Sequence, residues 1–314
     1  MERPRIDNSV DKWGKADFDK IYNAADPREY FRVLYGLDYV IPELAKSVFE
    51  SLIDYSLDTA RTRLKLLDIG SSYGINSALI RHPLDIHRLA QRYASTDMYG
   101  LTPEEIIRLD RHYFSSWPRR ENLSFVGVDT AEPAIAYAKA VGLIEGGVTT
   151  NLEERDPTEK DRAVLKGADL IISTGCVGYV SSRTFARLLA CQDRKKLPVV
   201  ASLVLRMFSY DDIAASLAAL GMVTEKLEGV TFVQRRFISS DEYESAMEQL
   251  RARGVDPSGK EADGLMHAEL YVTRPAEQVE RAPLREIISI TSGAHRRYGR
   301  RFRRLDGERA MLMH

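Results

Sequence analysis

Residues 66–80 read LLDIGSSYGINSALI, and this stretch decides the fold. Apolar residues lead into Asp68, glycines follow at Gly70 and Gly74, and an amphipathic pattern comes next. This order predicts a buried strand, a tight turn and a helix whose free N–H groups can approach a ligand. The acid at the end of the strand restricts which ligand such a turn can bind.

The composition is that of one α/β domain with additions. The chain has 314 residues, of which 44% are hydrophobic, and this is enough to bury a sizeable core. Its 45 Lys and Arg residues nearly balance its 46 Asp and Glu residues, so no global field attracts nucleic acid or an anionic membrane. We therefore expect a small-molecule partner, and a monomer or homodimer.

The sequence also favours a cytoplasmic location. The first residues, MERPRIDNSV, lack the apolar run of a signal peptide, and no stretch approaches the ~18 apolar residues of a membrane span. The two cysteines, Cys176 and Cys191, make no disulfide framework. The six histidines show no metal-ligand spacing, so we expect no metal site.

From residue 64 onward, short apolar runs alternate with helical stretches. The runs are apolar on both faces, which indicates a parallel sheet covered by helices on both sides. Two late stretches, MVTEKLEGVTFVQRRF and MHAELYVTRP, are strand-like without a buried helix between them. We therefore expect a doubly wound, Rossmann-like sheet of seven strands with an antiparallel edge pair, built by residues 64–275.

Three segments lie outside this alternation. Residues 1–63 carry helical patterns and predict a helical extension that serves as a lid, with Asp26 and Pro27 placed to begin a helix. Residues 95–121 form an insertion where a short connection is usual. Residues 276–314 form a basic tail that contains RRYGRRFRR.

The aromatic residues of the extension allow two interpretations. In the stretch YNAADPREYFRVLYGLDY they could cover a substrate. Alternatively, Tyr30, Leu34 and Tyr35 form a helix face that packs on the sheet.

The glycine turn differs from the dinucleotide fingerprint G-x-G-x-x-G. Residues 70–74 read GSSYG, without the middle glycine, and Asp68 lies two residues before the first glycine. A carboxylate there would repel a pyrophosphate but attract an ammonium and a sulfonium group. S-adenosylmethionine carries both cations.

These residues resemble class I S-adenosylmethionine-dependent methyltransferases. LLDIGSSYG resembles their first motif, D/E-x-G-x-G-x-G, with Ser72 in place of the middle glycine. FVGVDTAEPAIAYAKA is similar to the second motif, in which an acid accepts both ribose hydroxyls, and Asp129 takes that place. ADLIISTGCVGYV is similar to the fourth strand and the loop that faces the methionine moiety and the substrate. The resemblance covers roughly residues 64–275.

The resemblance implies a set of residues that bind S-adenosylmethionine. They are Asp68, Gly70, Ser72, Tyr73 and Gly74 in the first motif, Asp129 in the second, Asn151 and Leu152 after the third strand, and Thr174 and Gly175 after the fourth. Glu153, Glu154 or Asp156 could make the polar adenine contact in place of Asn151. The side chain of Ser72 is tolerable if its backbone keeps a negative φ.

An oxygen acceptor would need a general base, usually histidine or tyrosine, whereas an unprotonated amine would not. Tyr179, which follows the fourth strand, and the histidines His82 and His112 are the catalytic candidates. Tyr73 and Tyr179 could equally be packed aromatic residues.

The insertion at 95–121 is expected to help enclose the substrate, because it is long enough to cross back to the carboxyl ends of the strands. Its helix should start near Thr102 and Pro103. The expected lining residues are Tyr99, Ile106, Ile107, His112, Tyr113, Phe114 and Trp117. The alternative is that the segment packs on the outer face of the first helix and only stabilises the fold.

The leading hypothesis is methyl transfer from S-adenosylmethionine to a small-molecule nucleophile, with an O, N or C acceptor, in secondary metabolism. One alternative is a nucleic-acid methyltransferase or binding protein that uses the basic tail as an anchor. Another is an NAD-dependent oxidoreductase on a similar sheet.

Overall fold

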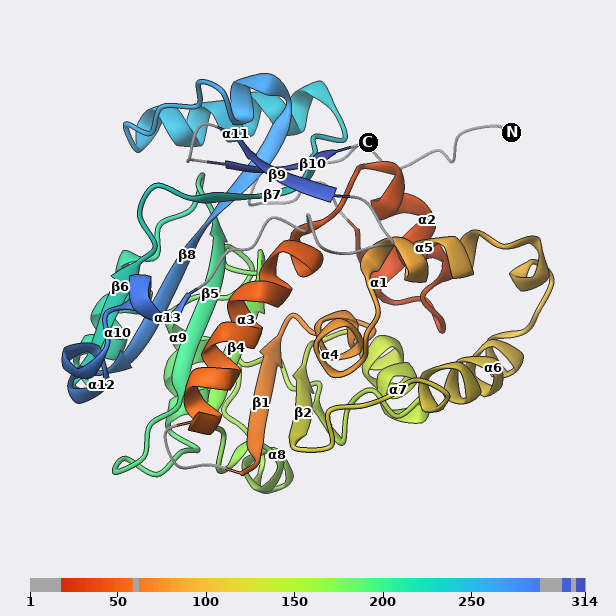
Figure 1. Cartoon of the computed structure of the whole chain (residues 1–314), viewed down its shortest axis with the longest axis horizontal. Helices are drawn as coiled ribbons and strands as arrows, with labels where there is room; N and C mark the ends of the chain where they lie inside the picture. The colour runs from red at the N-terminus through yellow and green to blue at the C-terminus, as the bar shows by residue number, and fades with distance from the viewer. Residues whose placement is uncertain (1–17, 59–61, 289–300, 306–308, 314) are drawn as a thin grey trace.

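The computed structural model describes residues 18–58, 62–288, 301–305 and 309–313, and it confirms a doubly wound α/β fold (Figure 1). Five parallel strands form its centre: β1 (Leu64–Ile69), β2 (Leu123–Val128), β3 (Gly146–Val148), β4 (Leu170–Thr174) and β5 (Val199–Leu205). Their order in the sheet is β3-β2-β1-β4-β5. The order reverses between β1 and β4, where α/β sheets of this kind bind ligands.

Helices cover both faces because the strands are apolar on both sides. One face packs on α3 (Ile41–Asp58), α4 (Ile75–Arg81) and α7 (Glu132–Ala140), and the other on α8 (Glu159–Leu165), α9 (Ser182–Leu189) and α10 (Asp211–Ala218). Neighbouring residues of one strand belong to different hydrophobic clusters, as Leu66 and Leu67 do. This alternation is the side-chain period of a strand buried on both faces.

The late strands differ in detail from the prediction. Residues 222–236 form two strands, β6 (Met222–Lys226) and β7 (Thr231–Arg236), because the chain turns at Gly229, whose φ is +72°. Both pair antiparallel with the long strand β8 (Leu265–Pro275), which is itself antiparallel to β5. Helix α11 (Ser240–Ala252) and the short η2 (Glu261–Asp263) connect β7 to β8.

The described part of the chain forms a sheet of ten strands where seven were predicted. The additional strands include β9 (Arg301–Leu305) and β10 (Arg309–Met313), and β10 pairs parallel with β7. The predicted antiparallel pairing at this side of the sheet is confirmed, and β10 and β9 extend the sheet beyond β7. Helices α12 (Ala276–Arg281) and α13 (Leu284–Ile287) precede these strands, and residues 289–300, which hold the first part of the arginine-rich stretch, lie outside the described residues.

The N-terminal segment, residues 18–58, begins above the carboxyl ends of the strands (Figure 1). It contains α1 (Asp19–Tyr22), α2 (Arg28–Gly36) and α3. Asp26 accepts a hydrogen bond from the backbone N–H of Arg28, so the predicted helix start is displaced by one residue. Because α3 ends just before β1 begins, the start of this 18-residue helix lies ~27 Å away, near the opposite end of β1.

The insertion, residues 95–121, lies on the side of α4 and α7 that faces away from the sheet (Figure 1). Helix α5 (Ile86–Ala94) leads into it, and it contains η1 (Thr96–Met98) and α6 (Pro103–Ser115). Thr102 and Glu105 form the capping box that starts α6, as the sequence predicts. Helix α6 packs against α7, and Phe114 is buried in the main hydrophobic cluster.

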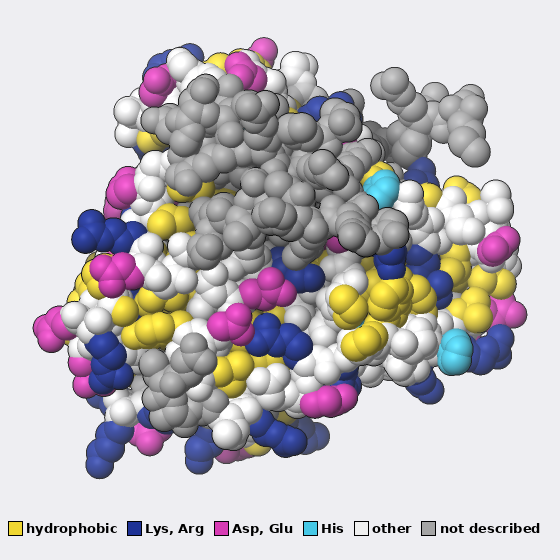
Figure 2. Space-filling view, viewed as in Figure 1, with side chains coloured by type: hydrophobic (Ala, Val, Ile, Leu, Met, Phe, Trp, Pro, Cys, Tyr) yellow, Lys and Arg dark blue, Asp and Glu magenta, His cyan; other side chains and the backbone are white. Residues whose placement is uncertain are grey.

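On the face in Figure 2, described Lys and Arg side chains lie among Asp and Glu side chains and do not gather in one patch. This agrees with the near-balance of charge in the composition. In the described ranges we find no helix both long and apolar enough to cross a membrane.

Candidate active site

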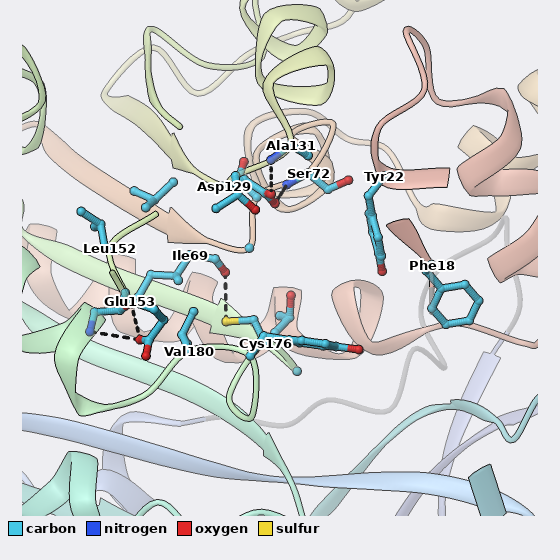
Figure 3. A pocket seen from close by; sticks show the side chains of 18 of the residues that line it. Phe18, Tyr22, Ile69, Ser72, Asp129, Ala131, Leu152, Glu153, Cys176 and Val180 are labelled. Atoms are coloured by element: carbon cyan, nitrogen blue, oxygen red, sulfur yellow. Dashed lines mark hydrogen bonds between the residues drawn. The ribbon is translucent and has the colours of Figure 1, made fainter. Parts of the chain in front are cut away.

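A cavity of about 1070 Å³ lies at the carboxyl ends of β1, β2, β4 and β7 (Figure 3). Its lining comes from the N-terminal segment, the glycine turn and the loops after β2, β3 and β4, and includes Phe18, Tyr22, Tyr30, Tyr39, Gly70, Ser72, Asn76, Asp129, Asn151, Leu152, Thr174, Gly175, Cys176, Tyr179 and Gln234. The volume slightly exceeds the ~300–1,000 Å³ of a pocket for one small molecule. It is therefore large enough for a cofactor and a second molecule.

The glycine turn after β1 has the geometry that its sequence predicts. Gly70 and Gly74 have φ values of +71° and +77°, which favour glycine. A Cβ at Gly70 would lie 2.9 Å from the Cβ of Cys176, so a side chain there would displace the loop after β4. Gly74 is the N-cap residue of α4 and does not line the cavity.

Ser72 differs from the expectation of a negative φ. Its φ is +47°, in the left-handed region. For a residue with a Cβ this costs roughly 1–2 kcal/mol. The turn holds it there through a hydrogen bond of 2.8 Å from the backbone N–H of Ser72 to Oδ2 of Asp129.

Asp129 lies where the second motif implies, at the end of β2, and lines the cavity. Its Oδ2 accepts from Ser72 and its Oδ1 accepts from the backbone N–H of Ala131 at 3.0 Å (Figure 3). A carboxylate has about four acceptor positions, so two are available to a ligand. Burial raises the pKa of Asp129, while the two N–H groups favour its charged form.

Asp68 does not line the cavity, because Asn76 lies in front of it. Asp68 is fully buried, its Oδ1 accepts from Nδ2 of Asn76 at 2.9 Å, and its Oδ2 has no hydrogen-bond partner. Burial raises its pKa to about 7. Asn76 also donates to Oγ1 of Thr174 at 3.2 Å, so its own Oδ1 is the group without a partner. Asn76 lines the cavity, and the sequence analysis missed it.

Tyr73 is not a cofactor contact in this geometry. It is fully buried, and its hydroxyl donates to the backbone oxygens of Ile21 and Ala24 at 2.7 and 2.8 Å. Its ring packs edge-on against Tyr30 and Tyr137. Tyr73 therefore ties the glycine turn to the N-terminal segment, and it does not line the cavity.

The loop after β3 supplies Asn151 and the buried Leu152 to the cavity. Glu153 lines it too, but its carboxylate accepts from the backbone N–H groups and hydroxyls of Ser181 and Thr184. These bonds lower its pKa, although burial acts in the opposite direction. Glu153 thus holds the start of α9 in place, which leaves Asn151 as the better candidate for an adenine contact.

The loop after β4 closes the cavity from below in Figure 3. Thr174 and Gly175 line it, as the third matching stretch implies, and so does Cys176. Tyr179 lies at the mouth with 43% of its surface exposed. Of the three catalytic candidates, it alone lines the cavity.

His82 and His112 are both outside the cavity. His82 is buried, its Nδ1 lies 3.1 Å from the backbone oxygen of Pro118, and burial lowers its pKa. His112 is exposed near the end of α6. Neither histidine is among the residues that line the cavity, so a general base at either position stays a prediction from the sequence.

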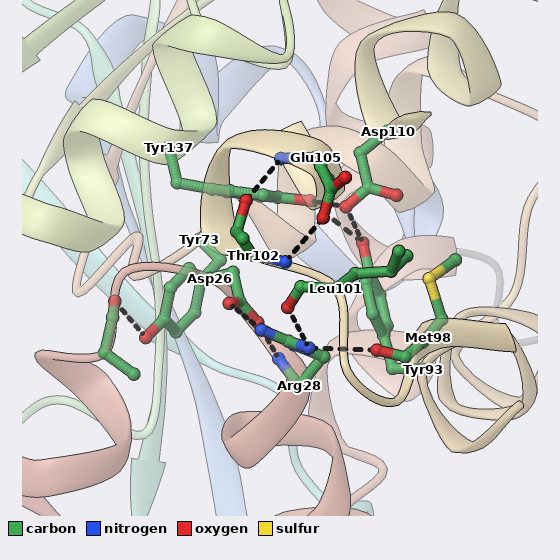
Figure 4. A network of polar contacts seen from close by, with 11 residues as sticks. Asp26, Arg28, Tyr73, Tyr93, Met98, Leu101, Thr102, Glu105, Asp110 and Tyr137 are labelled. Atoms are coloured by element: carbon green, nitrogen blue, oxygen red, sulfur yellow. Dashed lines mark hydrogen bonds and ion pairs between the residues drawn. The ribbon is translucent and has the colours of Figure 1, made fainter. Parts of the chain in front are cut away.

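The insertion does not line the cavity, contrary to the prediction, since no described lining residue belongs to 95–121. It supports the surrounding structure through the buried Asp110 (Figure 4). Oδ1 of Asp110 accepts from Arg92 at 2.7 and 2.9 Å, and Oδ2 accepts from Tyr93 at 3.0 Å and Tyr137 at 2.6 Å. Thus α5, α6 and α7 are joined at one carboxylate.

The insertion also holds the N-terminal segment in place. Arg28 donates to the backbone oxygens of Met98 and Leu101 at 2.9 and 3.0 Å, and it pairs with Asp26 at 2.8 Å (Figure 4). The sequence predicted that the insertion would form a wall of the cavity. In the structure, the aromatic residues of α1, α2 and the following loop form this wall instead. Tyr30 and Leu34 line the cavity, whereas the hydroxyl of Tyr35 bonds to Nδ1 of His87 on α5.

Gln234 and Arg235 on β7 are further lining residues that the sequence analysis missed. The available signal was that this pair directly follows the apolar residues Phe232 and Val233 within one strand-like stretch. For metal ligands, the described chain shows no group of three or more His, Cys, Asp or Glu side chains suitably placed to hold an ion.

Comparison with known proteins gives fold similarity only. No family model matches the chain, and neither does any curated protein. Among solved structures, the plantazolicin methyltransferase BpumL in complex with SAH is 14% identical, covers 74% of this chain and 84% of its own, and has a TM-score of 0.35. A TehB-like SAM-dependent methyltransferase from Corynebacterium glutamicum is 15% identical, covers 72% of this chain and 87% of its own, and has a TM-score of 0.34.

The magnesium protoporphyrin IX methyltransferase ChlM from Synechocystis, with bound SAM, is 12% identical, covers 73% of this chain and 79% of its own, and has a TM-score of 0.34. These scores are too low to support an argument about activity. The fold assignment therefore rests on the strand order and on the doubly wound helices of this chain.

Proposed function

We propose that this chain transfers a methyl group from S-adenosylmethionine to a small-molecule nucleophile. The observation that carries the proposal is Asp129, a cavity-lining carboxylate at the end of β2 that is fixed by two backbone N–H groups and retains acceptor capacity. Such an acceptor suits the two hydroxyls of a ribose.

The residues around the turn fit the rest of the methyl donor. The unpartnered Oδ1 of Asn76 and the buried carboxyl of Asp68 behind it suit an ammonium group. Leu152 and Val180 offer apolar contacts, and Asn151 offers a polar one, to an adenine ring. Because Gly70 has no Cβ, the loop after β4 can lie against the glycine turn at Cys176.

When bound, the donor would supply an electrophilic methyl group on a positive sulfur. The chain itself has to hold the acceptor in line with that group and exclude water. The N-terminal segment can do this, because Tyr30 and Leu34 lie over the cavity and are almost fully buried.

The site offers few groups that could act as a base. No histidine occurs among the described residues that line the cavity, and burial raises the pKa of Tyr22, Tyr30 and Tyr39. The exposed Tyr179 is the candidate that the sequence analysis and the geometry share. Product analysis with labelled donor would identify the acceptor atom.

Substitution Asp129→Ala tests the proposal. It should weaken S-adenosylmethionine binding by ~2 kcal/mol or more in calorimetric titration, because two hydrogen bonds to a charged acceptor are lost together. Asp54→Ala is the matched control, since Asp54 is exposed, pairs with Arg120 and does not line the cavity. Equal donor affinity in both variants would contradict the ribose assignment, and tight binding of NAD in place of the donor would favour an oxidoreductase.

The pH dependence of binding provides a second test. With a pKa of about 7, Asp68 is protonated at pH 6 and ionised at pH 8. A cationic donor favours the ionised form, so its affinity should rise as pH increases through 7 and then level off. Asp68→Asn should remove this rise, and a wild-type affinity that does not change with pH would contradict the charge assignment.

A further inference from the structure

Gln234 is a lining residue that holds a buried oxygen acceptor. Its side chain is 6% exposed and its Oε1 has no hydrogen-bond partner. A Cβ at Gly175 would lie 2.3 Å from Nε2 of Gln234, so the nitrogen side of the amide packs on the loop after β4. An unpaired buried acceptor costs roughly 1–3 kcal/mol, and a ligand N–H or O–H group would remove that cost.

Aromatic side chains surround this end of the cavity. Tyr22 and Phe18 lie across the cavity from Leu152 and Glu153 (Figure 3). The rings of Tyr30 and Tyr39 pack edge-on. Flat walls of this kind favour a planar ring over a flexible chain.

The same end has no unmatched positive charge. Of the described lining residues, the buried cation is Arg235, whose two Nη atoms bond to the buried carboxylate of Glu242 at 2.7 and 2.8 Å. Arg183 also lines the cavity but is exposed at its mouth. An anionic ligand would lose its hydration without gaining a partner.

We infer that this end of the cavity binds an uncharged planar aromatic acceptor whose N–H or O–H group donates to Oε1 of Gln234. The inference rests on the proposed function, since it assigns the other end of the cavity to the methyl donor. It excludes phosphorylated and carboxylated acceptors.

Three naphthalenes test this inference by equilibrium dialysis against the full chain. They are 2-naphthol, which is neutral with a donor group, 2-methoxynaphthalene, which is neutral without one, and the anion 2-naphthoate. We expect 2-naphthol to bind about tenfold more tightly than the other two, as one hydrogen bond to a buried acceptor allows. Equal binding of 2-naphthoate, or no saturable binding of any probe, would overturn the inference.

Substitution Gln234→Met removes the amide at similar volume. It should abolish the preference for 2-naphthol and leave the affinity for 2-methoxynaphthalene within about twofold. The matched control is Gln249→Met on α11, outside the cavity, which should change neither affinity. Tyr22→Leu should weaken both neutral probes alike. An undiminished preference in Gln234→Met would overturn the role of Gln234.

Titration of the same samples with S-adenosylhomocysteine separates the two proposals. If S-adenosylhomocysteine binds but 2-naphthol does not, the inference of an aromatic acceptor is refuted and the proposal of methyl transfer stands. Binding of 2-naphthol without S-adenosylhomocysteine would refute the proposed function instead. Far-UV circular dichroism of each variant establishes that a lost affinity does not come from unfolding.

Discussion

The N-terminal segment and the insertion at 95–121 are both helical additions to the same sheet, but only the first lines the cavity. Their connections to the strands explain the difference. The insertion leads into β2, which begins at the amino edge of the sheet, whereas α3 runs back along β1 and so places everything before it above the carboxyl edge. Both segments join their strands at the amino edge, so the direction in which a segment runs from that edge is a better guide to its role than its length or aromatic content.

The strongest test of this comparison is Asp110→Ala in the insertion. It should lower the free energy of unfolding by about 3 kcal/mol, because Arg92 and two tyrosine hydroxyls lose their buried partner. Chemical denaturation measures this loss. Asp97→Ala, at an exposed position of the same insertion, should change stability by less than about 0.5 kcal/mol.

Donor and 2-naphthol affinities of the folded Asp110→Ala protein should stay within about twofold of wild type, since neither Asp110 nor its hydrogen-bond partners line the cavity. If the variant keeps its stability but loses 2-naphthol binding, the insertion does belong to the enclosure and the comparison fails.

A smaller effect is expected from Arg28→Met, which separates the two regions from each other. Loss of the bonds to Met98, Leu101 and Asp26 should lower the free energy of unfolding by about 2 kcal/mol. Because α2 is released, the affinity for 2-naphthol should fall more than the affinity for the methyl donor. The control is Arg32→Met one turn later, whose exposed pair with Glu29 contributes less than about 1 kcal/mol. Equal behaviour of both variants would show that the insertion does not hold the N-terminal segment.

The smallest effect is expected in the glycine turn, which belongs to neither region. Ser72→Gly should raise the free energy of unfolding by about 0.5 kcal/mol, because relief of the positive φ outweighs the greater freedom of glycine in the unfolded chain. Thermal and chemical denaturation of the variant would detect it. A marked loss of stability would mean that the buried Oγ of Ser72 has a role that the backbone does not reveal.

Most of the fold could be predicted from the sequence because it depends on local order. Strand, helix and glycine turn follow each other within a few residues, and the structure has them in the predicted sequence from β1 to β5. Asp129 and Gly70 were found for the same reason, since each directly follows its strand.

The predictions that failed concern features that depend on tertiary contacts. Periodicity cannot reveal that Asn76 covers Asp68, that Tyr73 points away toward Ala24, or that Gln234 packs on Gly175. Strand pairing across a long separation was likewise out of reach, as with β10 on β7. The histidines were proposed by residue type alone, and type carries no information about distance from the cavity.

The contacts between the N-terminal segment and β7 have a consequence for the order in which the chain is made. The backbone N–H of Val40 donates to the oxygen of Gln234 at 2.9 Å, and Arg236 bonds to Asp38 across 198 positions of sequence. During synthesis the segment leaves the ribosome long before β7 exists, so Val40 and Asp38 lack these partners over most of translation. This protein should therefore depend on chaperones, and aggregation of nascent chains should be greatest for lengths that end before β7.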